Sequence, residues 1–125
     1  MLMKIENIKF KAKKTLDGKW IKGDLVHHKD SDNVWITDYE NQLTSPVDPL
    51  TVCQFTGLKD CEGNEIWEGD IISSPHFERV ATVKWDDSLC GFKCSDVTGN
   101  INFCFTAIAH CSEWSIVGNK FDKKK

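Results

Sequence analysis

The chain has 125 residues, 40% of them hydrophobic and 28% charged, a balance typical of globular domains and unlike that of disordered segments. Its formal net charge of −3 provides no overall attraction to nucleic acid or to an anionic membrane. No window approaches the roughly 18 apolar residues of a membrane span, and the N-terminus alternates in polarity where a signal peptide would be continuously apolar. We therefore expect one cytoplasmic domain, residues 1–125, with one core.

Alternation of apolar and polar residues predicts short β-strands in the N-terminal part of the chain. Segments with this pattern follow one another at residues 7–13, 20–26 and 34–39. Asp17-Gly18 and the polar run at 29–33 have the composition of turns between them. The sequence thus predicts a meander over about residues 5–40, and residues 41–49, which contain two prolines, are expected to form a loop.

The remainder of the chain shows a similar pattern and predicts a C-terminal β unit over about residues 50–121. Candidate strands lie at residues 50–55, 65–67, 70–73, 80–85, 91–97, 100–105 and 114–117. Helix is considered only for residues 106–114, and residues 122–125 form a basic tail. The expected fold is mostly β with little helix, either a small barrel or a sandwich built from two meanders.

Two segments of the chain resemble each other. Residues 20–26 and residues 66–72 each place a bulky apolar pair before Gly-Asp and two aliphatic residues. Glycine inside a strand often marks a bulge, and a neighbouring aspartate can accept hydrogen bonds from turn amides. The match predicts two similar bent hairpins, although coincidence within a β-rich composition explains it equally well.

A more specific pattern lies in the centre of the chain. It reads Val52-Cys53-Gln54-Phe55-Thr56-Gly57-Leu58-Lys59-Asp60, followed by Gly63-Asn64-Glu65-Ile66-Trp67-Glu68-Gly69-Asp70-Ile71-Ile72. This pattern resembles the signature of the YopX family of phage and prophage proteins. Weaker matches at residues 8–12, 83–86 and 116–121 extend the resemblance over nearly the whole chain.

The resemblance implies a gene of a mobile element, a bacterial cytoplasm and a homo-oligomer. It carries no established activity, so it assigns no catalytic or binding residue. Most of the matching polar and glycine positions are interpreted as turn chemistry. Cys53 and Cys61 stand where the family is expected to have small or polar residues, so a function based on cysteine would not be a family property.

The six cysteines are expected to be reduced and mostly packed, as in other cytosolic proteins. The residue types that could bind zinc are Cys90, Cys94, Cys104, His110 and Cys111. Their spacing is looser than a Cys-x-x-Cys knuckle, and adjacent residues of an extended segment point to opposite sides. A reactive thiol near His110 lacks an identifiable orienting acid. We therefore assign no zinc ligand and no catalytic cysteine.

A second polar cluster comprises His27, His28, Asp30 and Asp32. It resembles the start of a calcium loop, but the glycine and the terminal glutamate of that loop are absent, so a hairpin turn is the better interpretation. The sequence supports no metal site, no cofactor site and no catalytic residue. It does not exclude catalysis.

Features that would suit nucleic acid are Lys9, Lys11, Lys13, Lys14, the terminal lysines 123–125, and five tryptophans that could stack on bases. Lysines on a strand can instead discourage pairing at a sheet edge, and tryptophans of a small protein commonly form its core. A single-stranded nucleic-acid-binding module is therefore the alternative function.

The favoured hypothesis is a non-enzymatic binding or assembly protein of a phage or prophage that acts through protein contacts as a homo-oligomer. A metal-binding or enzymatic protein ranks last. Five Trp, seven Phe and one Tyr are many for a small domain, which leaves apolar surface available for interfaces. The expected interaction surface includes Trp20, Trp35 and Phe77.

Overall fold

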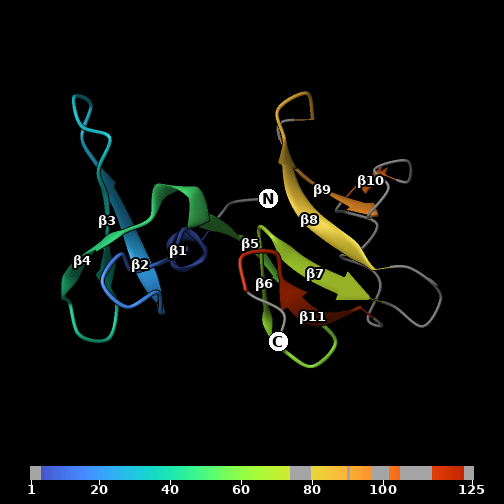
Figure 1. Ribbon diagram of the computed structural model, residues 1–125. Helices are drawn as coiled ribbons and strands as arrows, with labels where there is room; N and C mark the ends of the chain where they lie inside the picture. Colours follow the sequence, from blue (N-terminus) through green and yellow to red (C-terminus); the bar gives the residue numbers. More distant parts are fainter. Residues whose placement is uncertain (1–3, 74–79, 90, 97–101, 105–113, 123–125) are drawn as a thin grey trace. The chain divides into compact units, whose positions relative to one another are not determined.

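The structure is a computed structural model that describes residues 4–73, 80–89, 91–96, 102–104 and 114–122 (Figure 1). The chain divides into two compact units, Met1–Phe55 and Thr56–Lys125. Within the described residues the secondary structure consists of antiparallel strands and two short 3-10 turns, with no α-helix. The prediction of a mostly β fold with little helix is confirmed. No helix in this part of the chain has the length and apolar composition that crossing a membrane requires.

The first sheet has the strand order β4-β3-β2-β1-β5-β6, and the second has the order β10-β9-β8-β7-β11. Each order has two ends, so neither sheet closes into a barrel within the described strands. The first unit contains η1 (Ile5–Asn7), β1 (Phe10–Lys13), β2 (Trp20–His27), β3 (Val34–Asp38), β4 (Thr44–Val47), η2 (Pro49–Thr51) and the start of β5 (Cys53–Lys59). The second contains the end of β5, β6 (Glu65–Trp67), β7 (Asp70–Ser73), β8 (Ala81–Asp86), β9 (Gly91–Asp96), β10 (Asn102–Cys104) and β11 (Ser115–Asn119).

The N-terminal meander forms as the alternation predicts. β2 pairs with β1 on one side and with β3 on the other, both antiparallel. Ala12 lies opposite Ile21, and these two pack with Ile36 and Val47 in a buried cluster. Burial of this apolar face stabilises the meander at roughly 25 cal/mol per Å² removed from water.

The segment expected to be a loop, residues 41–49, contains strand β4, so this expectation was wrong for Thr44–Val47. β4 pairs with β3, and Trp35 lies opposite Pro46. Because β4 is the last strand at this end of the sheet order, a proline that cannot donate a ladder hydrogen bond is tolerated there. The composition of this segment therefore predicts a turn, although the segment forms an edge strand.

The second unit has a hydrophobic cluster of its own, where one core had been expected for the chain. Its buried members are Ile66, Ile72, Ala81, Val83, Cys94 and Trp114. They come from β6, β7, β8, β9 and the residue before β11. Short strands that each bury one face account for a separate cluster in each unit. The helical segment considered at residues 106–114 lies outside the described residues except for Trp114.

The internal resemblance does not correspond to two similar hairpins. Gly23 lies inside β2, where an added Cβ would fall 1.8 Å from the Thr37 carbonyl oxygen. Gly69 instead lies in the turn between β6 and β7 and has a φ of 88°, which favours glycine. The first glycine permits close strand approach and the second permits a tight turn, so the repeat is a coincidence of sequence.

Candidate functional site

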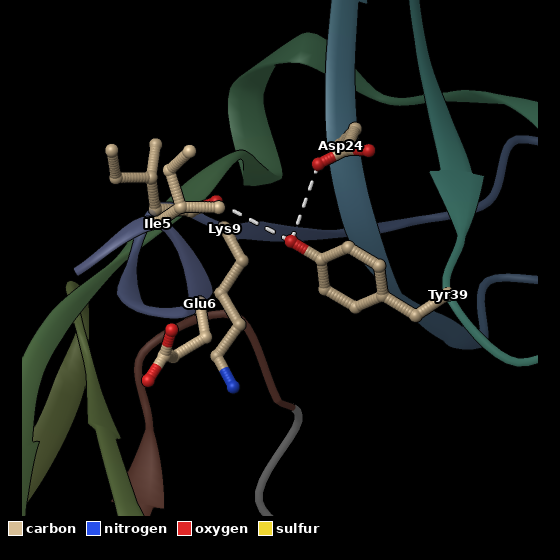
Figure 2. Close-up of a pocket in the computed structure, with 6 residues that line it drawn as sticks. Ile5, Glu6, Lys9, Asp24 and Tyr39 are labelled. Atoms are coloured by element: carbon tan, nitrogen blue, oxygen red, sulfur yellow. Dashed lines mark hydrogen bonds between the residues drawn. The ribbon is translucent and has the colours of Figure 1, made fainter.

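The first unit contains an open groove of about 570 Å³. Its lining residues are Ile5, Glu6, Ile8, Lys9, Asp24 and Tyr39. They come from η1 and the segment before β1, from β2, and from the residue after β3 (Figure 2). The groove therefore joins three parts of the meander that are separated in sequence.

The walls of the groove are apolar and accessible to solvent. The exposed fractions of Ile5, Ile8 and Tyr39 are 84%, 45% and 46%. The 3-10 turn η1, closed by the Ile8 N–H donating to the Ile5 carbonyl at 2.9 Å, holds the two isoleucines at the start of the meander. Apolar side chains gathered at one exposed site are a common feature of interaction surfaces.

The Tyr39 hydroxyl lies between two acceptors on different segments. It is 3.2 Å from Oδ1 of Asp24 on β2 and 3.3 Å from the carbonyl oxygen of Ile8 (Figure 2). A phenol has one hydrogen to donate, so it bonds to one of these oxygens at a time. Either bond ties the end of β3 to a neighbouring segment and fixes the position of the ring in the groove.

The charges of the groove are two carboxylates, Glu6 and Asp24, and one ammonium, Lys9. The Lys9 ammonium lies over the Phe55 ring, 4.7 Å from its centroid, a distance at which a cation–π contact is attractive. Two negative charges against one positive charge leave the groove with an excess of one negative charge.

A second candidate surface lies on β1 and β2, on the face opposite the Ala12–Ile21 pair. The register places Lys11 opposite Lys22 and Lys13 opposite Trp20. The ammonium groups of Lys11 and Lys13 lie 4.6 Å and 5.4 Å from the Trp20 ring centroid. β1 lies between β2 and β5, so protection of a sheet edge does not explain its lysines.

The two described residues of the expected interaction surface do not form one patch. Trp20 and Trp35 lie on the same face, since Trp35 is opposite Val26 of β2, and both are half-buried. Six residue steps along β2 separate Trp20 from Val26, or roughly 20 Å at the usual strand rise. The third residue, Phe77, lies outside the described residues.

The central sequence pattern forms β5, β6 and β7 together with the two turns that connect them. Oδ1 of Asp60 accepts the N–H groups of Glu62 and Asn64 at 2.9 Å and 2.8 Å. Oδ2 of Asp60 accepts the Ile116 N–H at 3.2 Å. This carboxylate therefore organises the turn after β5 and also contacts β11.

Asp70 has the same kind of role at the next turn. Its Oδ2 accepts the Trp67 N–H at 2.7 Å, and its Oδ1 accepts the Asn119 side-chain amide at 3.0 Å. Thr56 contributes at β5, where its hydroxyl donates to the Ile66 carbonyl at 2.6 Å. The interpretation of these positions as turn chemistry is confirmed for Asp60 and Asp70, and Thr56 joins β5 to β6.

Comparison with known families agrees with this pattern. The family model described as YopX protein matches residues 9–124. The chain belongs to the YopX family. No curated protein matches the chain.

In this YopX chain the signature supports the fold of the second unit, whereas the groove belongs to the first unit. Two aspartates of the signature, Asp60 and Asp70, use their carboxylate oxygens to accept hydrogen bonds from other residues of the chain. The family match at residues 9–124 also begins after Ile5, Glu6 and Ile8. The groove is therefore not built from the signature.

The cysteines and histidines considered as ligands are only partly described. Cys94 is buried in β9, where burial raises the pKa of its thiol to about 12. Cys90, His110 and Cys111 lie outside the described residues, and Cys104 is described only as part of the backbone of β10. In the described ranges no group of three His, Cys, Asp or Glu residues is placed to hold a metal ion.

The polar cluster begins at His27, the last residue of β2, and continues through the hairpin turn that leads to β3, in agreement with its interpretation from sequence. The Ser31 N–H donates to the His28 carbonyl at 3.2 Å, and the His28 ring meets Trp35 edge-on at 5.4 Å between centroids. The exposed carboxylates of Asp30 and Asp32 face solvent at this turn.

Sequence reasoning missed the groove residues Ile5, Glu6, Asp24 and Tyr39. Ile8 and Lys9 were assigned to a strand with a dry and a wet face, which gave no reason to examine them as a site. One feature of the sequence pointed to an apolar surface here. Ile5 is an apolar residue that precedes the alternating segment and is not part of the predicted strand. What the sequence lacked was the position of Tyr39 beside Asp24.

Proposed function

We propose that this YopX protein is a non-enzymatic phage or prophage protein of the bacterial cytoplasm. It works by binding or assembling protein chains, itself included, as a homo-oligomer. The observation that supports action through protein contacts is the groove in the first unit, where Ile5, Ile8 and Tyr39 remain exposed around a hollow of about 570 Å³. The resemblance to a family of phage and prophage proteins supports the biological setting.

Covering the exposed apolar wall of the groove with a second protein would release free energy. Ile5 and Ile8 would each contribute roughly 25 cal/mol per Å² if a second protein covered them. Interface centres are more apolar than the rest of the surface and are enriched in aromatic side chains such as that of Tyr39. Both properties favour a protein partner over a soluble small metabolite.

The lysine and tryptophan face supports a second candidate, binding of single-stranded nucleic acid. Lys11, Lys13 and Lys22 share this face, and cations near an aromatic ring suit a backbone phosphate beside a stacked base. However, two ammonium groups already lie over the Trp20 ring, so a base would have to displace them to stack there. The net charge of −3 also opposes approach of a polyanion.

Affinity capture from induced bacterial cells, with and without nuclease, tests the proposal. Protein partners that remain in stoichiometric amounts after nuclease treatment would support it. Loss of every captured protein on nuclease treatment would overturn it and favour the nucleic-acid candidate.

A further inference from the structure

We infer that the groove of the first unit binds a segment of a different protein that carries an aliphatic side chain next to a lysine or arginine. This inference rests on the proposed function and adds the chemistry of the partner. Three properties of the groove lead to it: its openness, its charge and its prearranged walls.

The openness of the groove favours a protein segment over a small ligand. Pockets for small molecules commonly bury most of the ligand surface. Here Ile5, Ile8 and Tyr39 are 84%, 45% and 46% exposed, so the walls could cover only part of a small molecule. A protein segment brings its own backbone and neighbouring side chains, which would cover the outer sides of these walls.

The apolar wall and the charges specify two neighbouring groups on the partner. An aliphatic side chain matches Ile5 and Ile8. A cation next to it matches the carboxylates of Glu6 and Asp24, which outnumber the single ammonium of Lys9. The Lys9 ammonium also lies over the Phe55 ring, 4.7 Å from its centroid. A basic residue beside an aliphatic one therefore complements the groove.

The groove is already arranged in the isolated chain. The Tyr39 hydroxyl, within 3.3 Å of both Asp24 and Ile8, links the walls, and η1 is closed by its own backbone hydrogen bonds. Walls that need no reordering lower the entropic cost of binding. A short linear segment could then bind without a larger rearrangement of the first unit.

A display library of random octapeptides, selected on the full chain, tests this directly. We expect the selected peptides to be enriched in Leu, Ile or Val adjacent to Lys or Arg. The probes for titration are the enriched peptides themselves, made synthetically. Their affinity should fall by about tenfold or more for the double variant Ile5→Ser and Ile8→Ser, because the apolar contact is lost. Glu6→Lys should weaken binding by about threefold or more, most strongly at low salt.

The matched control is Leu16→Ser, which removes another exposed aliphatic side chain, 92% exposed and outside the groove. This variant should bind the selected peptides as the unchanged chain does. Far-ultraviolet circular dichroism and melting temperature establish that each variant is folded. Glu6→Lys is the second test should the double variant fail to fold.

Several outcomes would overturn the inference. The inference is wrong if the selected peptides are not enriched in an aliphatic residue next to Lys or Arg. It is also wrong if the enriched peptides bind the groove variants as tightly as they bind the unchanged chain. If the double variant instead dissociates a homo-oligomer, the occupant is a second copy of this chain and the assignment to a different protein is wrong. If no peptide binds but the chain is still a homo-oligomer, only this inference is overturned and the proposed function stands. A monomer that binds single-stranded DNA overturns the proposed function itself.

Discussion

The side-chain amide of Asn119 donates a hydrogen bond to the Asp70 carboxylate at 3.0 Å, although 49 positions separate the two residues. Both are buried, with exposed fractions of 6% and 2%. The second oxygen of the Asp70 carboxylate accepts the Trp67 N–H at 2.7 Å. One carboxylate thus joins the turn between β6 and β7 to the end of β11.

Replacement of this carboxylate should be strongly destabilising. We expect Asp70→Ala to lower the free energy of unfolding by about 3 kcal/mol, because buried donors lose their charged acceptor. Urea denaturation followed by tryptophan fluorescence measures the change. Asp32→Ala, at an exposed turn position, is the control and should change stability by less than about 0.5 kcal/mol. Equal effects of the two substitutions would contradict the structural role of Asp70.

Asp60 should make stability depend on pH in the acidic range. Burial raises the pKa of its carboxyl, but hydrogen bonds from Asn64, Ile116 and Glu62 outweigh burial and hold the pKa below its ordinary value of 3.8. A carboxyl whose pKa is lower in the folded state stabilises the fold above the unfolded pKa, and this stability is lost as pH falls through the folded pKa.

The comparison of Asp60→Asn with the unchanged chain tests this dependence. The difference in unfolding free energy should be largest near neutral pH and should shrink below about pH 4. Urea titrations at a series of pH values from neutral to strongly acidic measure it. A difference that is constant over this range would show that the charge of Asp60 contributes nothing.

Gly23 should tolerate no side chain. An added Cβ would fall 1.8 Å from the Thr37 carbonyl oxygen, and backbone of the paired strand cannot move without breaking the β2–β3 ladder. We expect Gly23→Ala to destabilise the chain by about 2 kcal/mol or more. Gly118→Ala is the matched control, since nothing lies within 4 Å of its added Cβ. Thermal melts of the two variants should differ clearly, and coincident melts would contradict the close approach.

The described cysteines should differ in reactivity. Cys61 is exposed, whereas Cys53 and Cys94 are buried, and burial raises the pKa of the Cys94 thiol to about 12. Because the thiolate is the reactive form, iodoacetamide at mildly alkaline pH should label Cys61 before Cys53 and Cys94. Peptide mass spectrometry gives the order. After denaturation without reductant all six cysteines should be labelled, and labelling of Cys94 as fast as Cys61 in the folded chain would be contrary to its burial.

Strand alternation was a reliable guide where one face of a strand is buried. The alternation puts Ala12 on the dry face of its strand, and Ala12 is buried opposite Ile21 in the first cluster. The pattern failed at β4, because Pro46 and its polar neighbours have turn composition, and only the pairing with β3 makes them a strand. Edge strands carry little of the alternation that sequence reasoning uses.

The candidate site could be predicted much less well than the fold. The signature drew attention to Asp60 and Asp70, whose carboxylates are used within the chain. The groove depends on Tyr39, the residue after β3, lying beside Asp24 of β2, a contact between residues 15 positions apart in the sequence. Such a contact depends on strand register and side-chain direction, and neither can be predicted from composition.

The mass of the purified chain in solution tests the central claim most directly. Multi-angle light scattering over a range of micromolar concentrations compares it with the 14.2 kDa of a single chain. An integer multiple of that mass, unchanged by nuclease, is the result expected of a homo-oligomer that assembles through protein contacts. A mass of one chain throughout, together with binding of single-stranded DNA that weakens steeply as salt rises, would contradict the account.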